Sequence, residues 1–183
     1  ISPGNPTGKV LTEEEMALIV DIVVKNDLYL ICDEVYREFT YDGRELRSFG
    51  SFKEAEQNVI IVDSVSKRFS ACGARIGSIA SKNRELMQNL MKICQARLCC
   101  PTLDQVGAAA LYNLDPSYFN DIKKEYEYRR DVSVQALNEI EGIKYGVPEL
   151  RAKRARESLI IEVMSSKLCA SVKLFFSIAI DKL

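Results

Sequence analysis

Histidine is absent from this chain of 183 residues. Catalytic triads of the Ser-His-Asp type and Cys-His pairs both use an imidazole as the base, so this absence excludes both mechanisms. The six cysteines include no Cys-x-x-Cys pair. A zinc site would therefore need thiolates or carboxylates alone, and their spacing offers none. We expect neither a metal ion nor a nucleophile that is activated by histidine.

The chain also has little net charge and no long apolar run. The formal net charge is -1, which gives no electrostatic reason to expect a nucleic-acid surface. The apolar run over residues 168–180 is interrupted by Lys173 and is too short to span a membrane. No basic leader precedes an apolar run at the start of the chain, and unpaired cysteines fit a reducing compartment. We therefore expect a cytoplasmic protein that binds neither membranes nor nucleic acid.

Apolar residues recur in helical and strand-like patterns that alternate along the chain. Met16, Ile19 and Val23 share one face of an expected helix, and Thr12 and Glu15 have the spacing of a capping box at its start. The short apolar runs suit strands that are buried on both faces. This alternation predicts an α/β domain with a mainly parallel sheet. The expected strands cover residues 28–32, 58–63 and 76–81, and further helices cover residues 83–97, 102–113 and 116–140.

Polar residues follow two of the expected strands directly. Asp33 comes after the first strand, and the stretch from Ser64 to Lys67 comes after the second. Binding sites in sheets of this kind lie beyond the carboxyl ends of the strands. We therefore expect these side chains to meet at one edge of the sheet.

Three segments together carry the motifs of a known family. They read Ser2-Pro-Gly-Asn5-Pro-Thr-Gly8, Asp33-Glu-Val-Tyr36 and Ser64-Val-Ser-Lys67-Arg-Phe-Ser-Ala-Cys-Gly-Ala-Arg75-Ile-Gly77. In this order and spacing they resemble the class I aminotransferases of fold type I, the aspartate aminotransferase family. The resemblance extends over residues 1–149. It implies part of the large domain that binds pyridoxal 5'-phosphate, with a mainly parallel sheet and flanking helices, plus the start of the small domain.

The resemblance implies that Lys67 is the catalytic residue. Its amine would bind the aldehyde of the cofactor covalently and, once displaced by substrate, would carry the proton between substrate and cofactor. Asp33 would face the pyridine nitrogen and keep it protonated, because a nearby opposite charge favours the charged form. Glu34 is the adjacent competitor, but the motif gives this role to Asp33. The structural alternatives are a solvated lysine and an aspartate that serves as a loop residue or helix cap.

The remaining cofactor contacts are also implied by the resemblance. Tyr36 and Asn5 would donate hydrogen bonds to the phenolate oxygen of the cofactor. Ser64 and Arg75, with Ser66 as a further contact, would bind the phosphate, since arginine offers a planar fork of donors to phosphate oxygens. Taken alone, Asn5 is also a good turn residue, Tyr36 a good core aromatic and Arg75 a plausible surface ion-pair partner.

Three neighbours of these residues complete the pattern. Gly73 and Gly77 flank Arg75 and favour a close approach of the backbone at that point. Arg68 directly follows Lys67, and the resemblance gives it no role.

The function implied is the transfer of an amino group between an L-amino acid and a 2-oxo acid, in a complete protein that is a homodimer. Two alternatives remain. A β-eliminating C-S lyase of the same fold uses the same cofactor anchors, and the chain could be an inactive, truncated remnant. The chain starts within a motif, and the family's fold needs a considerably longer chain. We therefore expect a fragment that has the cofactor-anchoring half of the site and no useful transaminase activity alone.

The resemblance divides the chain into three regions. Residues 1–113 are expected to be part of the large domain, residues 114–149 the linking helix and the start of the small domain, and residues 150–183 a divergent tail. After Pro148-Glu149 the family continues Gly-Ala-Phe-Tyr, whereas this chain continues Leu150-Arg-Ala-Lys. A shifted reading frame or a chimeric end would explain the change, and an unusual but genuine end is the alternative. The arginines of this tail do not occupy the position of the family's substrate-carboxylate arginine.

Overall fold

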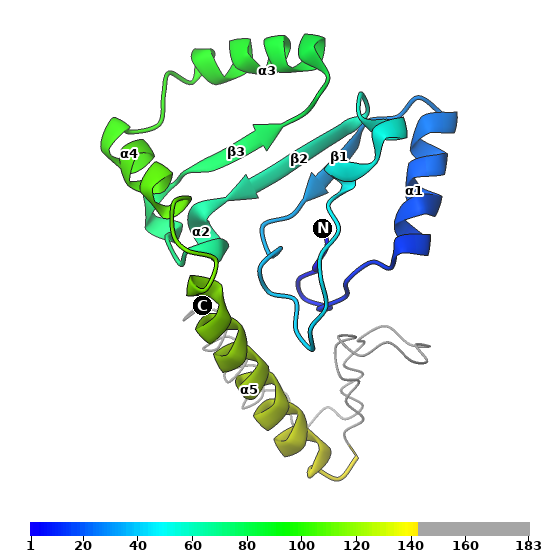
Figure 1. Cartoon of the computed structure of the whole chain (residues 1–183), viewed down its shortest axis with the longest axis vertical. Helices are drawn as coiled ribbons and strands as arrows, with labels where there is room; N and C mark the ends of the chain where they lie inside the picture. The colour runs from blue at the N-terminus through cyan, green and yellow to red at the C-terminus, as the bar shows by residue number, and fades with distance from the viewer. Residues whose placement is uncertain (143–183) are drawn as a thin grey trace.

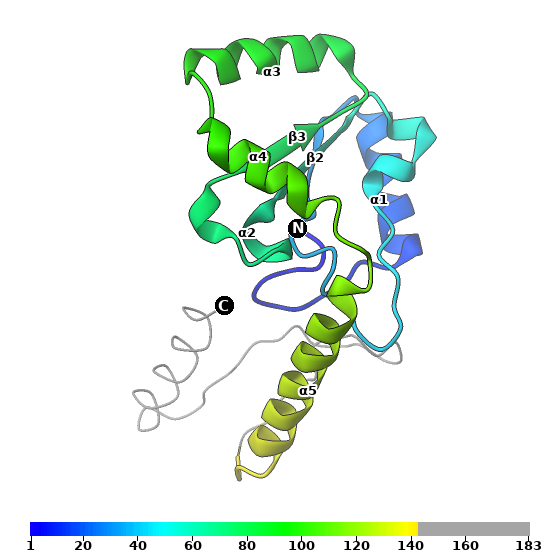
Figure 2. The same cartoon turned by 60° about the vertical axis from the view of Figure 1, so that its left-hand side comes forward.

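The computed structural model describes residues 1–142. These residues form a three-stranded sheet with helices around it and a long helix that projects away from it (Figure 1, Figure 2). The predictions for the divergent tail and for the last part of the linking segment fall on residues 143–183, outside the described residues.

The first helix, α1 (Glu13–Lys25), begins as predicted. The Thr12 hydroxyl accepts a hydrogen bond from the Glu15 N–H, and the Glu15 carboxylate accepts one from the Thr12 N–H. This capping box satisfies two N–H groups at the start of the helix. A bond from the Lys9 ammonium, and then the bond from Thr12, lower the pKa of the Glu15 carboxyl. The apolar face of the helix buries Met16, Val20 and Val23.

The sheet has the order β1 (Leu30–Asp33), β2 (Val59–Ser64), β3 (Gly77–Ala80). β1 and β2 are parallel, as predicted, whereas β3 runs antiparallel to β2. A single helical turn, α2 (Val65–Arg68), and a 3-10 turn, η3 (Cys72–Ala74), join β2 to β3. Neither turn carries the chain back along the sheet, so β3 starts where β2 ends. The carboxyl ends of β1 and β2 and the start of β3 therefore share one edge.

One face of the sheet carries the main core. There α1 and two 3-10 turns, η1 (Phe49–Ser51) and η2 (Lys53–Ala55), pack around Cys32 and Val59. The prediction that the strands are buried on both faces is wrong for β1 and β3, because Ile31 is 67% exposed and β3 is exposed throughout, whereas the adjacent Val59 and Ile60 of β2 are both buried. Successive side chains of a strand point to opposite faces, so the core that buries Cys32 on one face leaves Ile31 on the other face uncovered.

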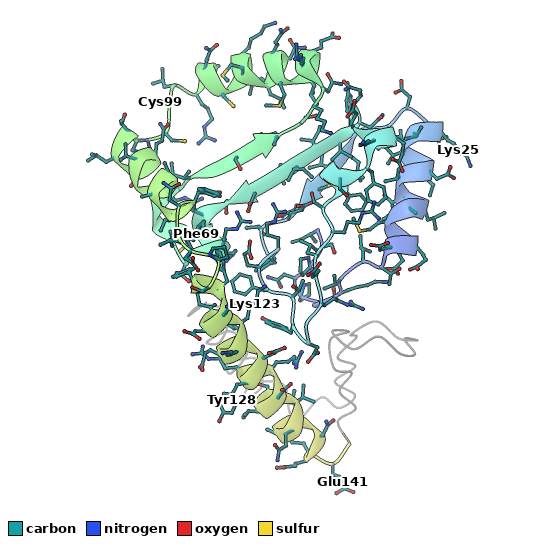
Figure 3. The ribbon with its side chains drawn as sticks, in the orientation of Figure 1. Lys25, Phe69, Cys99, Lys123, Tyr128 and Glu141 are labelled. Carbon is teal, nitrogen blue, oxygen red and sulfur yellow. The ribbon has the colours of Figure 1, made fainter. Side chains whose placement is uncertain are left out.

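The second half of the described chain is helical, as predicted, with α3 (Arg84–Ala96), α4 (Thr102–Leu111) and α5 (Tyr118–Asn138). A second core of Val65, Phe69 and Ala108 forms where α2, α4 and the start of α5 meet (Figure 3). Further along α5, Arg130 lies 3.0 Å from Asp42 and ties the helix to the segment after β1. Between residues 1 and 142, no helix combines the length and the apolarity that a bilayer span requires.

Candidate functional site

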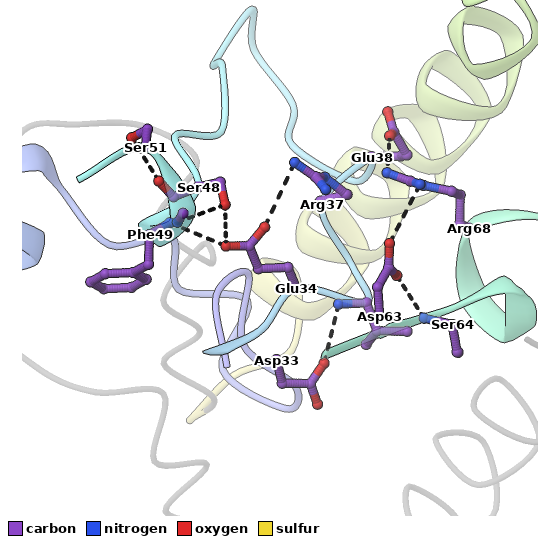
Figure 4. A network of polar contacts seen from close by, with 12 residues as sticks. Asp33, Glu34, Arg37, Glu38, Ser48, Phe49, Ser51, Asp63, Ser64 and Arg68 are labelled. Atoms are coloured by element: carbon purple, nitrogen blue, oxygen red, sulfur yellow. Dashed lines mark hydrogen bonds and ion pairs between the residues drawn. The ribbon is translucent and has the colours of Figure 1, made fainter. Parts of the chain in front are cut away.

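The candidate site lies at the edge where β1 and β2 end. Asp33 is the last residue of β1 and Ser64 is the last residue of β2. The α2 turn begins directly after Ser64 and contains Lys67. Asp33 is paired with Val62 in the parallel ladder, so the two strand ends are neighbours (Figure 4). The predicted carboxylate and the predicted amine are thus placed at the same edge. Their roles toward a cofactor stay predictions.

A second pair of predicted residues, Asn5 and Tyr36, meets beside this edge. The Ser2 N–H donates a hydrogen bond to the Asp33 carbonyl at 3.2 Å, which holds the N-terminal turn against the end of β1. Asn5 Nδ2 then donates to the Tyr36 hydroxyl oxygen at 3.0 Å. The hydroxyl proton of Tyr36 is left to be donated to another acceptor. The two side chains form one polar pair, although 31 positions separate them in the sequence.

The adjacent carboxylates of Asp33 and Glu34 have different surroundings (Figure 4). Glu34 is only 3% exposed. Its Oε1 accepts hydrogen bonds from Ser48 Oγ at 2.7 Å and from the Phe49 N–H at 3.2 Å. Asp33 is half-buried, and its Oδ1 accepts a bond from the Val35 N–H at 3.1 Å. Glu34 therefore anchors the η1 turn, whereas Asp33 stays at the strand end, within reach of a ligand.

The α2 turn presents two hydroxyls and one amine. The Oγ of Ser64 caps the turn by accepting a hydrogen bond from the Ser66 N–H at 3.2 Å. Its own hydroxyl proton is still available for an acceptor such as a phosphate oxygen. Ser66 and Lys67 follow within the same turn, and both are half-buried.

Arg75 is placed near this turn by its backbone but not by its side chain. The Val65 N–H donates to the Ile76 carbonyl at 3.2 Å, which brings the loop before β3 against α2. Arg75 itself is exposed and adopts a left-handed backbone conformation with φ of 56°. Its guanidinium donates through Nη1 to the Cys72 carbonyl at 3.0 Å. Among the described residues, this guanidinium makes no hydrogen bond with Ser64 or Ser66.

The two glycines around Arg75 differ. A Cβ on Gly77 would lie 3.1 Å from the Asp63 carbonyl oxygen and 3.5 Å from the Ser64 Cβ. The close approach predicted at Gly77 is therefore confirmed, and it lets β3 lie against the end of β2. A Cβ on Gly73 would meet no atom within 4 Å among the described residues, so the prediction of a close approach there is wrong.

Gly77→Ala should destabilise the protein by about 1–3 kcal/mol, because the added methyl group must push backbone atoms of β2 and β3 apart. Gly73→Ala is the matched control and should change the free energy of unfolding by less than about 1 kcal/mol. Urea unfolding of the two variants measures the difference. Equal stabilities would show that the contact of Gly77 with Asp63 is not restrictive.

A buried thiol also lies at this edge, in Cys32 next to Asp33. Burial raises the pKa of Cys32 to about 12, and the negative charge of Glu34 adds to the rise. Reactive cysteines have lowered pKa values, because the thiolate is the nucleophile. Cys32 is therefore a packed apolar group rather than a candidate nucleophile.

Arg68 was given no role by the sequence motifs, yet it is a centre of polar contacts (Figure 4). Its Nη2 lies 2.8 Å from Glu38 Oε1, and its Nη1 lies 3.4 Å from Asp63 Oδ2. Asp63 was the feature of the sequence that could have indicated this cluster, because it is a carboxylate within an apolar strand. The partner could not be identified from the sequence, because Glu38 is 30 positions from Arg68.

The donor set suits a phosphorylated pyridine aldehyde. Lys67 offers an amine for the aldehyde, and Asp33 offers a carboxylate for the ring nitrogen. The Asn5–Tyr36 pair keeps a hydroxyl proton for a phenolate oxygen, which is the feature of this structure that fits most directly. The hydroxyls of α2 suit a phosphate group.

Known proteins share this sequence pattern. The family described as aminotransferase class I and II matches residues 1–151. The aspartate aminotransferase of Musicola paradisiaca (strain Ech703) is 33% identical over 150 residues, which cover 81% of this chain and 37% of that protein. This chain therefore spans well under half the length of this relative.

Solved structures share the fold over a similar part. The aromatic aminotransferase from Pyrococcus horikoshii OT3 has a TM-score of 0.72 at 34% identity, covering 80% of this chain and 40% of that one. Cystalysin from Treponema denticola, whose structure contains a pyridoxal 5'-phosphate cofactor, has a TM-score of 0.72 at 26% identity. The match covers 80% of this chain and 38% of cystalysin.

Proposed function

Because this chain belongs to the aminotransferase class I and II family, we propose that it carries the cofactor-anchoring side of a pyridoxal-phosphate-dependent aminotransferase. The reaction is the transfer of an amino group between an L-amino acid and a 2-oxo acid. One observation carries the proposal: α2, which contains Lys67, begins directly after the end of β2, and Asp33 ends the parallel neighbour β1.

Pyridoxal phosphate, when bound, supplies an electron-withdrawing ring that stabilises negative charge on the substrate carbon. Lys67 would hold the cofactor through its amine, and the same amine, when free, would move a proton at that carbon. Asp33 keeps the ring nitrogen protonated, because its negative charge favours the positively charged form. Its place at the end of β1, free of the η1 contacts that occupy Glu34, supports this role.

The other predicted residues orient the cofactor. The hydroxyl of Tyr36 would donate its proton to the phenolate oxygen, and Asn5 would hold that hydroxyl in place. Ser64 and Ser66 donate to the phosphate from the α2 turn. Arg75 would add a further contact to the phosphate, because its guanidinium has five N–H donors and uses one of them on the Cys72 carbonyl.

The domain division and the assembly belong to the same proposal. Residues 1–113 form part of the large domain, and α5, within residues 114–149, leads toward the small domain. The projection of α5 away from the sheet supports this division (Figure 2). Amino acids and 2-oxo acids are the substrates, and the complete enzyme is a homodimer.

The experiment that tests the proposal is reductive trapping. The chain is incubated with pyridoxal phosphate, reduced with borohydride, digested and mapped by mass spectrometry. We expect saturable labelling of one lysine, Lys67, while exposed lysines such as Lys124 label only in proportion to reagent concentration. Labelling that follows exposure alone, without preference for Lys67, would falsify the proposal.

Turnover separates the proposed reaction from its alternative. Transamination requires a 2-oxo acid as acceptor, whereas β-elimination of a cysteine conjugate proceeds without one. The assay uses the complete, longer protein. We expect product only when both an amino acid and a 2-oxo acid are supplied. Release of thiol without any acceptor would identify a C-S lyase.

A further inference from the structure

Arg68 connects the two peptide segments that carry the candidate site. Its Nη1 contacts Asp63, at the end of β2, and its Nη2 contacts Glu38, in the segment that follows β1. The β1 side supplies Asp33 and Tyr36, whereas the β2 side supplies Ser64 and Lys67. Figure 4 shows the Arg68 side chain reaching from α2 across to Glu38.

We propose that Arg68 is a positioning residue that fixes the α2 turn, and with it Lys67, relative to the Asp33–Tyr36 segment. The inference rests on the proposed function, because it concerns the placing of Lys67 for the cofactor. Arg68 touches neither the substrate nor the cofactor in this role. It acts through the two carboxylates that it holds.

Burial makes this connection specific. The side chains of Arg68 and Asp63 are only 11% and 10% exposed, and that of Glu38 is 23% exposed. In such surroundings charges interact more strongly than in water, but removing them from water costs about as much as their attraction returns. The arginine Nε is buried without a hydrogen-bond partner among the described residues, which adds to the cost. An arrangement with so little net stabilisation is better explained by the geometry that it enforces.

Aromatic rings limit the remaining freedom of the guanidinium. It lies 5.8 Å from the ring centroid of Phe69 and 5.6 Å from that of Tyr112. Both distances are within the range of cation–π contacts. Tyr112 directly follows α4 and packs on Phe69, so Arg68 is held by carboxylates on one side and by the second core on the other. A lysine could not reproduce this, because it is a point charge without a planar fork.

Arg130 provides a matched control. Its side chain is 13% exposed, and its guanidinium contacts two carboxylates, those of Asp42 and Asp131. It differs from Arg68 in that α5, rather than the α2 turn, carries it. A loss that comes merely from removing a buried, doubly paired arginine should therefore appear in both variants.

The first measurement needs no cofactor. Hydrogen–deuterium exchange is followed in the full chain for Arg68→Met, Arg68→Lys and Arg130→Met. We expect Arg68→Met to raise exchange by about tenfold in residues 34–39 and in residues 65–70 together, because the link between the two segments is lost. Arg68→Lys should give a smaller rise in both segments. Arg130→Met should act near residue 42 and residues 127–131 and leave α2 unchanged.

The second measurement is borohydride trapping of pyridoxal phosphate on Lys67 as a function of its concentration. Arg68→Met should need about tenfold more cofactor for half-labelling, since small displacements of a reacting group are costly. The circular dichroism of the bound cofactor should change as well. Arg68→Lys should be intermediate, and Arg130→Met should match the wild type in both readouts.

The outcomes separate the two proposals. If Arg68→Met exchanges like the wild type, or if its exchange rises while Lys67 is trapped at wild-type concentrations, the positioning role is overturned. If Arg68→Met does not fold, Arg68→Lys decides by the same two criteria. If the wild-type chain is not trapped at Lys67 at all, the proposed function fails, and the exchange data alone still decide whether Arg68 joins the two segments.

Discussion

Lys67→Ala should abolish the saturable attachment of pyridoxal phosphate to this chain. The alanine has no amine to bond with the cofactor aldehyde, and the polar contacts that remain hold the cofactor only reversibly. Borohydride reduction followed by mass spectrometry measures the loss. Lys67→Arg should fail equally, because a guanidinium keeps the positive charge but is always protonated and cannot serve as the nucleophile.

Lys82→Ala is the control for this prediction. Lys82 is an exposed lysine that pairs with Glu56 at 3.2 Å, away from the α2 turn that carries Lys67. Its removal should leave the labelling of Lys67 unchanged. Saturable labelling that persists in Lys67→Ala on another lysine would show that the nucleophile has been misassigned.

The adjacent carboxylates should separate into a ligand-binding role and a structural role. Asp33→Ala should change the free energy of unfolding by about 1 kcal/mol or less, because the bond from the Val35 N–H is the only one that its side chain loses among residues 1–142. It should raise the cofactor concentration for half-labelling of Lys67 by about tenfold or more, since a charge-assisted contact to the ring nitrogen disappears.

Glu34→Ala should show the opposite pattern. The Ser48 hydroxyl and the Phe49 N–H both lose their acceptor, and Arg37 loses a carboxylate at 3.6 Å. We expect a destabilisation of about 2–4 kcal/mol, measured by urea unfolding. Cofactor binding by the fraction that stays folded should be close to normal. If Asp33→Ala is the less stable of the two variants, the structural role belongs to Asp33 and the assignment must be reversed.

Local signals were sufficient for much of the fold. The capping box of Thr12 and Glu15 was predictable because both partners lie within one helical turn. The positions of Asp33 and Ser64 at strand ends were predictable because each follows an apolar run directly. A parallel pairing of these strands then placed them at one edge without further information.

Contacts between distant segments were not predictable in the same way. The bond between Glu34 and Ser48, and the one between Arg68 and Glu38, depend on how loops return to the sheet. The hydrophobic periodicity of the sequence does not indicate where these loops pack against the sheet. The prediction that both faces of the sheet are buried was wrong for a related reason. An apolar composition shows that a strand can be buried, but it does not show which segment covers the strand.

Arg75 marks the limit of a motif. Its position in the sequence places its backbone beside α2, and the structure agrees. The direction of its side chain is decided instead by the left-handed backbone and by the nearby Cys72 carbonyl. A motif therefore predicts the place of this residue more reliably than its contacts.

The buried thiol of Cys32 gives the molecule an internal reporter. Thiol reagents modify the exposed cysteines of the native protein directly, whereas Cys32 can react only after the core around it has opened. Asp33 follows Cys32 in the same short strand. The rate at which Cys32 is modified therefore measures how often the strand that ends in Asp33 unfolds locally. A ligand that stabilises this edge of the sheet would slow the modification of Cys32.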